Sequence, residues 1–146
     1  MSGDALKPFA IFTELSDVER EDLTALLEER DLSKGETLFE EGDDADALVL
    51  VVNGCVELAT RRRADTLALS AGGTIGALAL FAVGTREMTA TGREPSDVLL
   101  LRREEFLRFA EDHPRAAFRI AAAVATESAL HARAALASVD PSGAGE

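Results

Sequence analysis

The sequence predicts a mainly β domain, a sandwich or a barrel, with a helix on its N-terminal side and helices on its C-terminal side. Three observations favour this class. Between residues 32 and 101, short β-prone runs alternate with turn signals at fairly regular spacing, which is typical of sandwiches and barrels. An amphipathic helical pattern precedes this region, and helical patterns return after it.

The segment before the predicted strands favours a short helix. Ser16 and Glu19 have the spacing of a capping box, in which the serine side chain accepts a hydrogen bond from the Glu19 amide and the glutamate side chain reaches back. Apolar residues from Val18 to Leu27 then recur at roughly helical spacing. We therefore expect a helix that continues through about Arg30.

Six β-prone runs make up the predicted β region. They span residues 37–39, 48–52, 55–60, 66–69, 88–93 and 98–101. The strongest turn signal between them is Asn53-Gly54, because a two-residue type I′ hairpin needs positive φ at both of its positions. This signal predicts a hairpin between the second and third runs. The exposed tip of a further hairpin is predicted at residues 61–63, which are all arginine.

Two helices are predicted after residue 101. The first covers residues 102–111 and carries Phe106, Leu107 and Phe109 as its apolar side chains. Pro114 suits the first turn of the second helix, which extends to about residue 138 and is half alanine from residue 116 onward. The polar tail at 140–146 is expected to be flexible, so residues 1–139 are predicted to form a single domain.

Composition and charge narrow the partners and the location. Of the 146 residues, 47% are apolar and 29% are charged, with a net charge of −12. A nucleic acid or a phospholipid surface would repel such a chain, so we expect neither as a direct partner. The single cysteine, Cys55, cannot form an internal disulfide. There is no signal-peptide pattern and no apolar run of membrane-spanning length, which predicts a cytoplasmic protein.

The residue patterns do not favour an enzyme. No nucleophile has a plausible base near it in sequence, no residues have metal-ligand spacing, and no Walker-type phosphate loop occurs. Paired acidic residues are better explained as cap, turn and surface charges. We therefore expect no catalytic residues, no metal and no required cofactor.

Residues 38–58 resemble the first half of a cyclic-nucleotide-binding domain, and residues 81–109, followed by Asp112-His113-Pro114, resemble its second half. The resemblance covers about residues 8–136, nearly the whole chain. It implies a β-roll or jelly-roll barrel, flanked by helices, that cups a cyclic nucleotide and passes its presence to a C-terminal helix. Many relatives dimerise through a parallel pair of such helices. Small alanine side chains suit close approach, so a homodimer is favoured over a helix folded back on its own domain.

The resemblance also implies a phosphate-binding turn. Gly76, Leu78 and Ala79 stand where the family has a Gly-Glu-Leu-Ala-like turn, whose free amides point at the cyclic phosphate. Arg86 matches the arginine that pairs with this phosphate. His131 lies in the part of the C-terminal helix that can cover the pocket and touch the base.

Two positions depart from the family pattern. Ala77 replaces the glutamate that accepts a hydrogen bond from the ribose hydroxyl, and Glu87 replaces a serine or threonine donor. Losing one hydrogen bond to a charged acceptor costs on the order of 1.5–3 kcal/mol. A carboxylate at position 87 either repels the phosphate or neutralises Arg86 by pairing with it.

Two functions remain open from the sequence. The first is a stand-alone regulatory sensor that binds cyclic AMP, cyclic GMP or another small anionic ligand and signals through its C-terminal helix. Its expected ligand-binding residues are Gly76, Ala77, Leu78, Ala79, Arg86, Glu87 and His131. The second is a ligand-free module for dimerisation or for binding a protein partner. A catabolite-activator-type transcription regulator needs a helix-turn-helix after the C-terminal helix, and since none occurs before Glu146, DNA reading is not expected.

Overall fold

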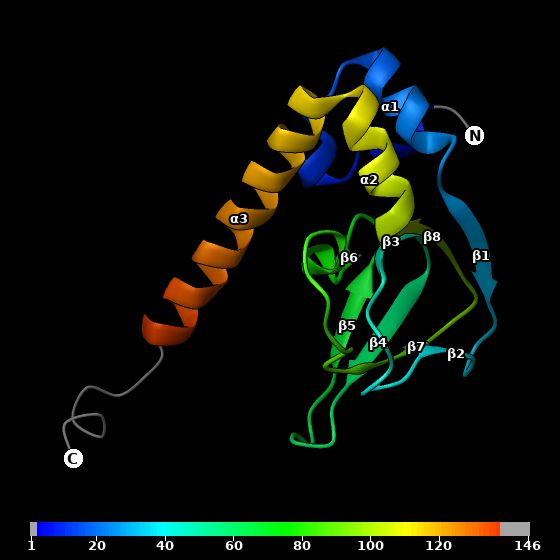
Figure 1. Ribbon diagram of the computed structural model, residues 1–146. Helices are drawn as coiled ribbons and strands as arrows, with labels where there is room; N and C mark the ends of the chain where they lie inside the picture. Colours follow the sequence, from blue (N-terminus) through cyan, green and yellow to red (C-terminus); the bar gives the residue numbers. More distant parts are fainter. Residues whose placement is uncertain (1–2, 138–146) are drawn as a thin grey trace.

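The protein is described by a computed structural model covering residues 3–137, in which antiparallel β-sheets are flanked by helices (Figure 1). The helical elements are η1 (Gly3–Leu6), η2 (Ala10–Phe12), α1 (Asp17–Thr24), η3 (Ala77–Leu80), α2 (Arg103–Asp112) and α3 (Pro114–Ala137), where η marks 3₁₀ turns. The strands are β1 (Glu28–Leu32), β2 (Thr37–Phe39), β3 (Ala47–Asn53), β4 (Cys55–Ala59), β5 (Leu67–Ser70), β6 (Thr74–Ile75), β7 (Thr89–Gly92) and β8 (Ser96–Arg102).

The strands form two four-stranded sheets, ordered β1-β8-β3-β6 and β2-β7-β4-β5. All of their pairings are antiparallel. This confirms the predicted mainly β, jelly-roll-like class, and each of the six predicted runs overlaps a strand. The sheets are not closed into a barrel, however. Within residues 3–137 no strand of one sheet pairs with a strand of the other, so side chains alone join the two layers.

Strands β3 and β8 are buried on both faces, which explains their nearly continuous apolar sequences. Leu48 and Leu50 point into a core shared with the helices, whereas Val49 and Val51 point into the core between the two sheets. This division follows from the period of two along a strand. The helices cover one face of the β1-β8-β3-β6 sheet, and the other sheet covers its opposite face (Figure 1).

The capping box at the start of α1 is confirmed. The Glu19 amide donates to Ser16 Oγ at 3.2 Å, and the Ser16 amide donates to Glu19 Oε1 at 2.8 Å. The predicted length is wrong, because α1 ends at Thr24 and the strand β1 begins at Glu28. Strand β1 pairs with β8 at the edge of its sheet, where charged residues are tolerated because one side of the strand faces solvent.

The predicted hairpin at Asn53-Gly54 is wrong. Strand β3 belongs to one sheet and β4 to the other, so this turn carries the chain between layers. Gly54 has φ +89°, but no non-glycine residue within 3–137 has positive φ, which rules out a type I′ turn. Glycine is needed for space as well, because a Cβ at Gly54 would overlap the side chain of Ser96. Ser96 Oγ in turn accepts from the buried Cys55 amide at 3.0 Å.

Helices α2 and α3 agree with the predicted segments to within a residue or two. The corner between them is fixed to α1 by His113, whose Nε2 lies 2.8 Å from Asp22 Oδ2. From this corner α3 runs down one side of the molecule and leans away from the sheets (Figure 1). None of the described helices is long and apolar enough to cross a membrane. The predicted flexible tail at 140–146 lies outside the described residues.

Candidate functional site

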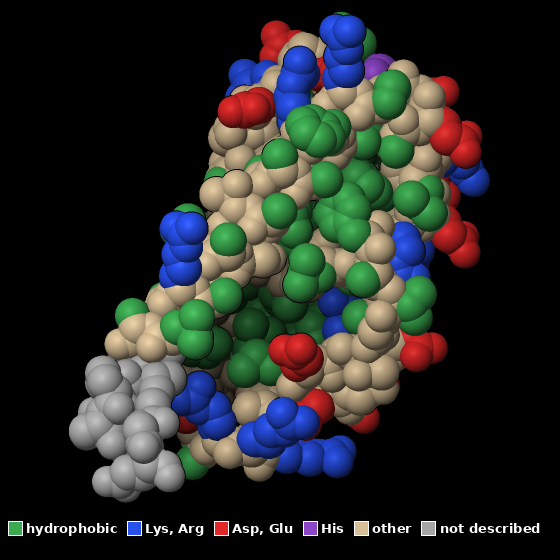
Figure 2. Space-filling view, turned by 60° about the vertical axis from the view of Figure 1, so that its left-hand side comes forward, with side chains coloured by type: hydrophobic (Ala, Val, Ile, Leu, Met, Phe, Trp, Pro, Cys, Tyr) green, Lys and Arg blue, Asp and Glu red, His purple; other side chains and the backbone are tan. Residues whose placement is uncertain are grey.

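A pocket of about 560 Å³ lies between η3, the segment 82–88 and α3, a volume that suits a small-molecule ligand. Figure 2 shows it as a hollow beside α3, floored mainly by hydrophobic side chains. All of the ligand-binding residues expected from the sequence line it. They are Gly76, Ala77, Leu78, Ala79, Arg86, Glu87 and His131. The fold thus brings them together from three separate elements, and their role in binding a ligand remains a prediction.

Arg86 is the one buried cation of this pocket among the described residues, and the protein holds it by uncharged contacts. Only 7% of the residue is exposed. Its Nη2 donates to the Ala47 carbonyl at 2.7 Å, and its Cζ lies 4.3 Å from the centre of the Phe39 ring. This distance is within the range of a cation–π contact. Both partners keep the guanidinium at the pocket wall without neutralising it.

No carboxylate of residues 3–137 lies within 4.0 Å of the Arg86 guanidinium. Its Nε is buried and has no hydrogen-bond partner. Burial lowers the pKa of Arg86, while the more distant Asp46 and Asp43 act in the opposite direction. A guanidinium nevertheless stays protonated in proteins. The pocket therefore contains a buried positive charge that no carboxylate of the described residues contacts directly.

Gly76 is required where η3 begins. Its φ is +74°, in the left-handed region that favours glycine. A Cβ at this position would also overlap Arg86 Nη1. The first hydrogen bond of η3 runs from the Ala79 amide to the Gly76 carbonyl at 3.0 Å, so the amides before Ala79 have no partner within the turn. Gly76 thus allows the turn and the arginine to lie against each other.

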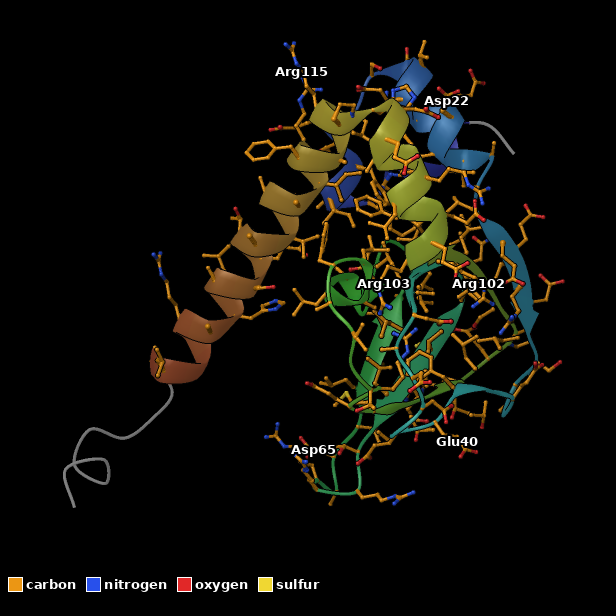
Figure 3. All side chains as sticks on the ribbon, viewed as in Figure 1. Asp22, Glu40, Asp65, Arg102, Arg103 and Arg115 are labelled. Atoms are coloured by element: carbon orange, nitrogen blue, oxygen red, sulfur yellow. The ribbon has the colours of Figure 1, made fainter. Side chains whose placement is uncertain are left out.

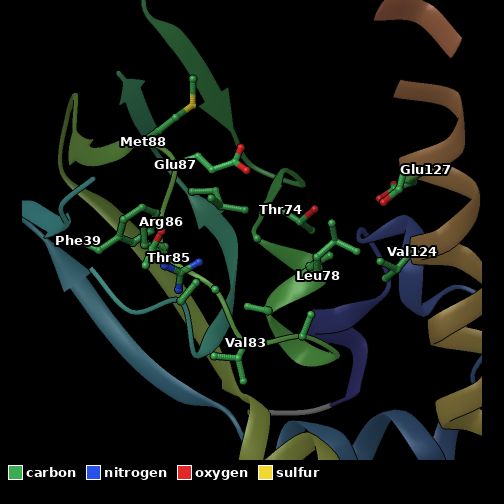
Figure 4. A pocket seen from close by; sticks show the side chains of 18 of the residues that line it. Phe39, Thr74, Leu78, Val83, Thr85, Arg86, Glu87, Met88, Val124 and Glu127 are labelled. Carbon is green, nitrogen blue, oxygen red and sulfur yellow. The ribbon is translucent and has the colours of Figure 1, made fainter. Parts of the chain in front are cut away.

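The two positions that depart from the family pattern have different surroundings. Ala77 is half-buried in the pocket wall, and its methyl group offers no acceptor. Glu87 is exposed and makes no ion pair with Arg86. In Figure 4 the Glu87 carboxylate and that of Glu127 extend toward the pocket from opposite walls. The Glu87 carboxylate therefore lies at the pocket rim and is not paired with Arg86.

Helix α3 supplies the far wall with Val124, Glu127, Ser128 and His131. Of these four residues, only His131 is expected from the sequence. The other three precede it by seven, four and three positions, so they share its helix face. This spacing was the signal that could have found them. Phe39 and Thr74 also line the pocket. Thr74 lies two residues before Gly76, whereas Phe39 comes from β2, distant in sequence, and left no such signal.

The chain matches the family model of the cyclic nucleotide-binding domain over residues 29–113. Among similar solved structures is the N-terminal domain of a transcriptional regulator from Streptomyces coelicolor A3(2), with 30% identity and a TM-score of 0.79. That match covers 88% of this chain and 94% of that one. A cyclic nucleotide-binding-like protein from Brucella abortus has 26% identity and a TM-score of 0.65, covering 75% and 97%.

The Catabolite Activator Protein of Thermus thermophilus is similar at 26% identity and a TM-score of 0.73, covering 86% of this chain. The match covers 59% of that protein, so the chain corresponds to a part of it. A search of curated proteins gave no match. The family match spans more than half of the 146 residues and includes η3, Arg86 and both sheets. The chain therefore belongs to the cyclic nucleotide-binding domain family, which consists of regulatory ligand-binding domains for cyclic AMP or cyclic GMP.

Proposed function

We propose that this protein is a regulatory sensor that binds a cyclic nucleotide, or another small anion of similar size, in the pocket beside Arg86. The observation that carries the proposal is the Arg86 guanidinium, buried at the pocket wall with no carboxylate within 4.0 Å in residues 3–137. A buried charge without a partner is costly. An anionic ligand supplies the missing counter-charge and forms charge-assisted hydrogen bonds.

The remaining walls suit the rest of a nucleotide. They are mainly apolar, with Ile75, Leu78, Val83, Met88 and Val124 among them. Apolar walls with a few polar groups are typical of small-molecule sites, in which the polar groups fix the orientation. Because α3 forms one wall and η3 the opposite one, a ligand in the pocket contacts both. This arrangement supports our proposal that the protein signals through the position of α3. We also propose that it acts in the cytoplasm.

Ala77 and Glu87 set the expected strength of binding. Without an acceptor at position 77, a ribose hydroxyl loses about 1.5–3 kcal/mol of interaction. The Glu87 carboxylate at the rim adds like-charge repulsion toward a phosphate, which salt screens because the side chain is exposed. We therefore expect a cyclic nucleotide to bind weakly, and a small anion that lacks a ribose loses nothing at position 77.

Calorimetric titration of the full chain with cyclic AMP and cyclic GMP tests the proposal. We expect saturable heat for at least one of them at millimolar concentration or below. Arg86→Gln should abolish the heat, because the ligand then has no counter-charge. Arg62→Gln is the matched control, since Arg62 is exposed at the β4–β5 tip and is not among the residues that line the pocket. Absence of heat and of any thermal shift in the wild type rejects the sensor function.

A second function, a dimerisation module, is favoured by the exposed face of α3. Six apolar residues on this face recur at alternating steps of four and three: Phe118, Ala122, Ala125, Ala129, Ala132 and Leu136. We call them the α3 seam. Such a repeat is the pattern of a coiled-coil contact, and its small central residues allow close approach of two helices. We propose that two copies pair through it, which is compatible with sensing.

The family resemblance implies a parallel pair of such helices, and we propose this orientation for the α3 seam. Sedimentation of wild type and of Ala125→Glu tests the dimer: we expect the variant to be monomeric, and equal masses for both proteins would contradict pairing through this face.

A further inference from the structure

Arg103, the first residue of α2, bonds to the back of the pocket wall. Its Nε donates to the Ala79 carbonyl at 2.6 Å, and its Nη2 donates to the carbonyls of Ala45 at 2.7 Å and Ala82 at 3.0 Å. No carboxylate of the described residues lies within ion-pairing distance of it. The neighbouring Arg102 instead pairs with Asp46 at 3.2 Å and Glu28 at 3.1 Å. Figure 3 shows both arginines at the end of α2 nearest the sheets.

The three carbonyls belong to two segments that line the pocket. Ala79 is in η3 and Ala82 follows it, whereas Ala45 precedes β3 more than thirty residues earlier in the chain. Carbonyls at the end of a helical turn lack partners within it. A planar guanidinium can satisfy several acceptors in fixed directions, which a single ammonium group does not do. Arg103 therefore holds both segments in one position relative to α2.

Other contacts join the same parts. The Arg103 amide donates to the Asp46 carbonyl at 2.8 Å. Phe81, directly after η3, packs edge-on against Phe106 of α2 with ring centres 5.2 Å apart. Phe106 and Phe109 of α2 share one core with Ile120 and Val124 of α3. A continuous set of contacts thus leads from η3 through Arg103 and α2 to the pocket-facing side of α3.

From this geometry we infer that Arg103 is the positioning residue that couples η3 to α2 and α3. The inference rests on the proposed function in one respect: we take ligand binding to be the event that shifts η3. When η3 moves, the Arg103 contacts make the first turn of α2 move with it. Without them the Phe81–Phe106 packing remains but the three hydrogen bonds are lost, so the response of α3 is much weaker. Arg103 does not line the pocket, so it affects how α2 and α3 respond to a shift of η3 and not the binding of the ligand itself.

The coupling can be tested without any ligand. Gly76→Ala perturbs the start of η3, because a Cβ there overlaps Arg86 Nη1 and the left-handed φ is strained. Amide hydrogen exchange across residues 103–137 reports the response of α2 and α3. We expect Gly76→Ala to change this exchange by at least about fivefold. In an Arg103→Ala background the change should fall below about twofold, whereas an Arg102→Ala background should leave it intact.

Two results overturn the inference. The first is that Gly76→Ala changes the exchange equally in the wild-type and Arg103→Ala backgrounds. The second is that Arg102→Ala removes the change as well. Arg103→Lys keeps the positive charge but loses the planar guanidinium. It therefore replaces Arg103→Ala in this experiment if Arg103→Ala does not fold. We expect a reduced change for Arg103→Lys, and a full wild-type change would also overturn the inference. With cyclic AMP or cyclic GMP, Arg103→Ala should bind within about threefold of wild type but lose the exchange response of α3. If wild type binds neither nucleotide, the proposed function fails while the Gly76→Ala comparison still decides the role of Arg103.

Discussion

Two buried arginines, Arg20 in the helical layer and Arg86 in the pocket wall, have similar burial and different partners. Only 9% of Arg20 and 7% of Arg86 are exposed, and each leaves its Nε without a hydrogen-bond partner. Arg20 donates to the Asp17 carboxylate and the Leu15 carbonyl, both at 2.5 Å. Arg86 has one side-chain hydrogen bond, to the Ala47 carbonyl, and no carboxylate.

The difference separates a structural charge from a charge available for binding. Arg20 finds its counter-charge three residues away on its own helix, so the folded chain neutralises it. Arg86 is held by a carbonyl and an aromatic ring, which fix its position but leave its charge uncompensated. No ion pair within the described residues offsets the burial of Arg86, and this supports the proposal that the pocket binds an external anion.

The largest effect on stability is expected from Arg20. Arg20→Met leaves the buried Leu15 carbonyl without a donor and removes the contact to Asp17. We expect the free energy of unfolding to fall by about 3 kcal/mol. Urea unfolding followed by circular dichroism measures it. A loss below that of a surface substitution such as Arg62→Gln would show that Arg20 does not hold the N-terminal helical layer in place.

Restoring an acceptor in the pocket should strengthen binding. Ala77→Glu returns a carboxylate where a ribose hydroxyl lies in the family, so cyclic AMP or cyclic GMP should gain about 1.5–3 kcal/mol. Titration calorimetry of Ala77→Glu and of Ala77→Gln measures the gain and separates charge from hydrogen bonding. Unchanged affinity would mean that the sugar of a bound nucleotide does not lie beside residue 77.

A smaller effect on stability is expected at Arg86. Arg86→Met loses the Ala47 hydrogen bond and also relieves the uncompensated buried charge, and these changes oppose each other. We expect unfolding free energy within about 1 kcal/mol of wild type when no ligand is present. A loss as large as that of Arg20→Met would make the two arginines equivalent and remove the contrast between them.

The smallest effect concerns the capping box of α1. Hydrogen bonding from the Ser16 amide holds the pKa of Glu19 below its ordinary value. Because the folded-state pKa is the lower one, the stabilisation is present above the unfolded-state pKa and is lost as pH falls through the folded-state pKa. Glu19→Gln should cost about 0.5 kcal/mol at pH 7 and should lose less stability on acidification. Glu21→Gln changes an exposed residue on the same helix, and its unfolding free energy should match that of wild type both at pH 7 and after acidification.

Local signals in the sequence predicted the elements whose cause is local. The capping box, the apolar runs of β3 and β8 and the start of α3 at Pro114 all agree with the structure. Strand β1 was missed because its residues, Glu28 to Leu32, have low strand propensity, and pairing with β8 makes them a strand. The turn at Gly54 was misassigned because sequence spacing does not show which sheet the next strand joins.

The candidate site divides in the same way. The family pattern identified Gly76, Arg86 and His131, and the structure places them around one pocket. The lack of a carboxylate beside Arg86 could not be predicted, since it depends on where residues distant in sequence lie. For the same reason the contacts of Arg103 with Ala45 and Ala79 left no signal, because they join positions 58 and 24 residues apart.

We propose above all that Arg86 binds an external anion. The dependence of the unfolding free energy on ligand concentration tests this most directly. The unfolding free energy of wild type and of Arg86→Met is measured against increasing cyclic AMP and cyclic GMP. A ligand that binds only the folded state at 100 times its Kd adds about 2.7 kcal/mol. We predict a rise for wild type and a flat line for Arg86→Met. Equal rises for both proteins, or no rise for wild type at millimolar ligand, would contradict the claim.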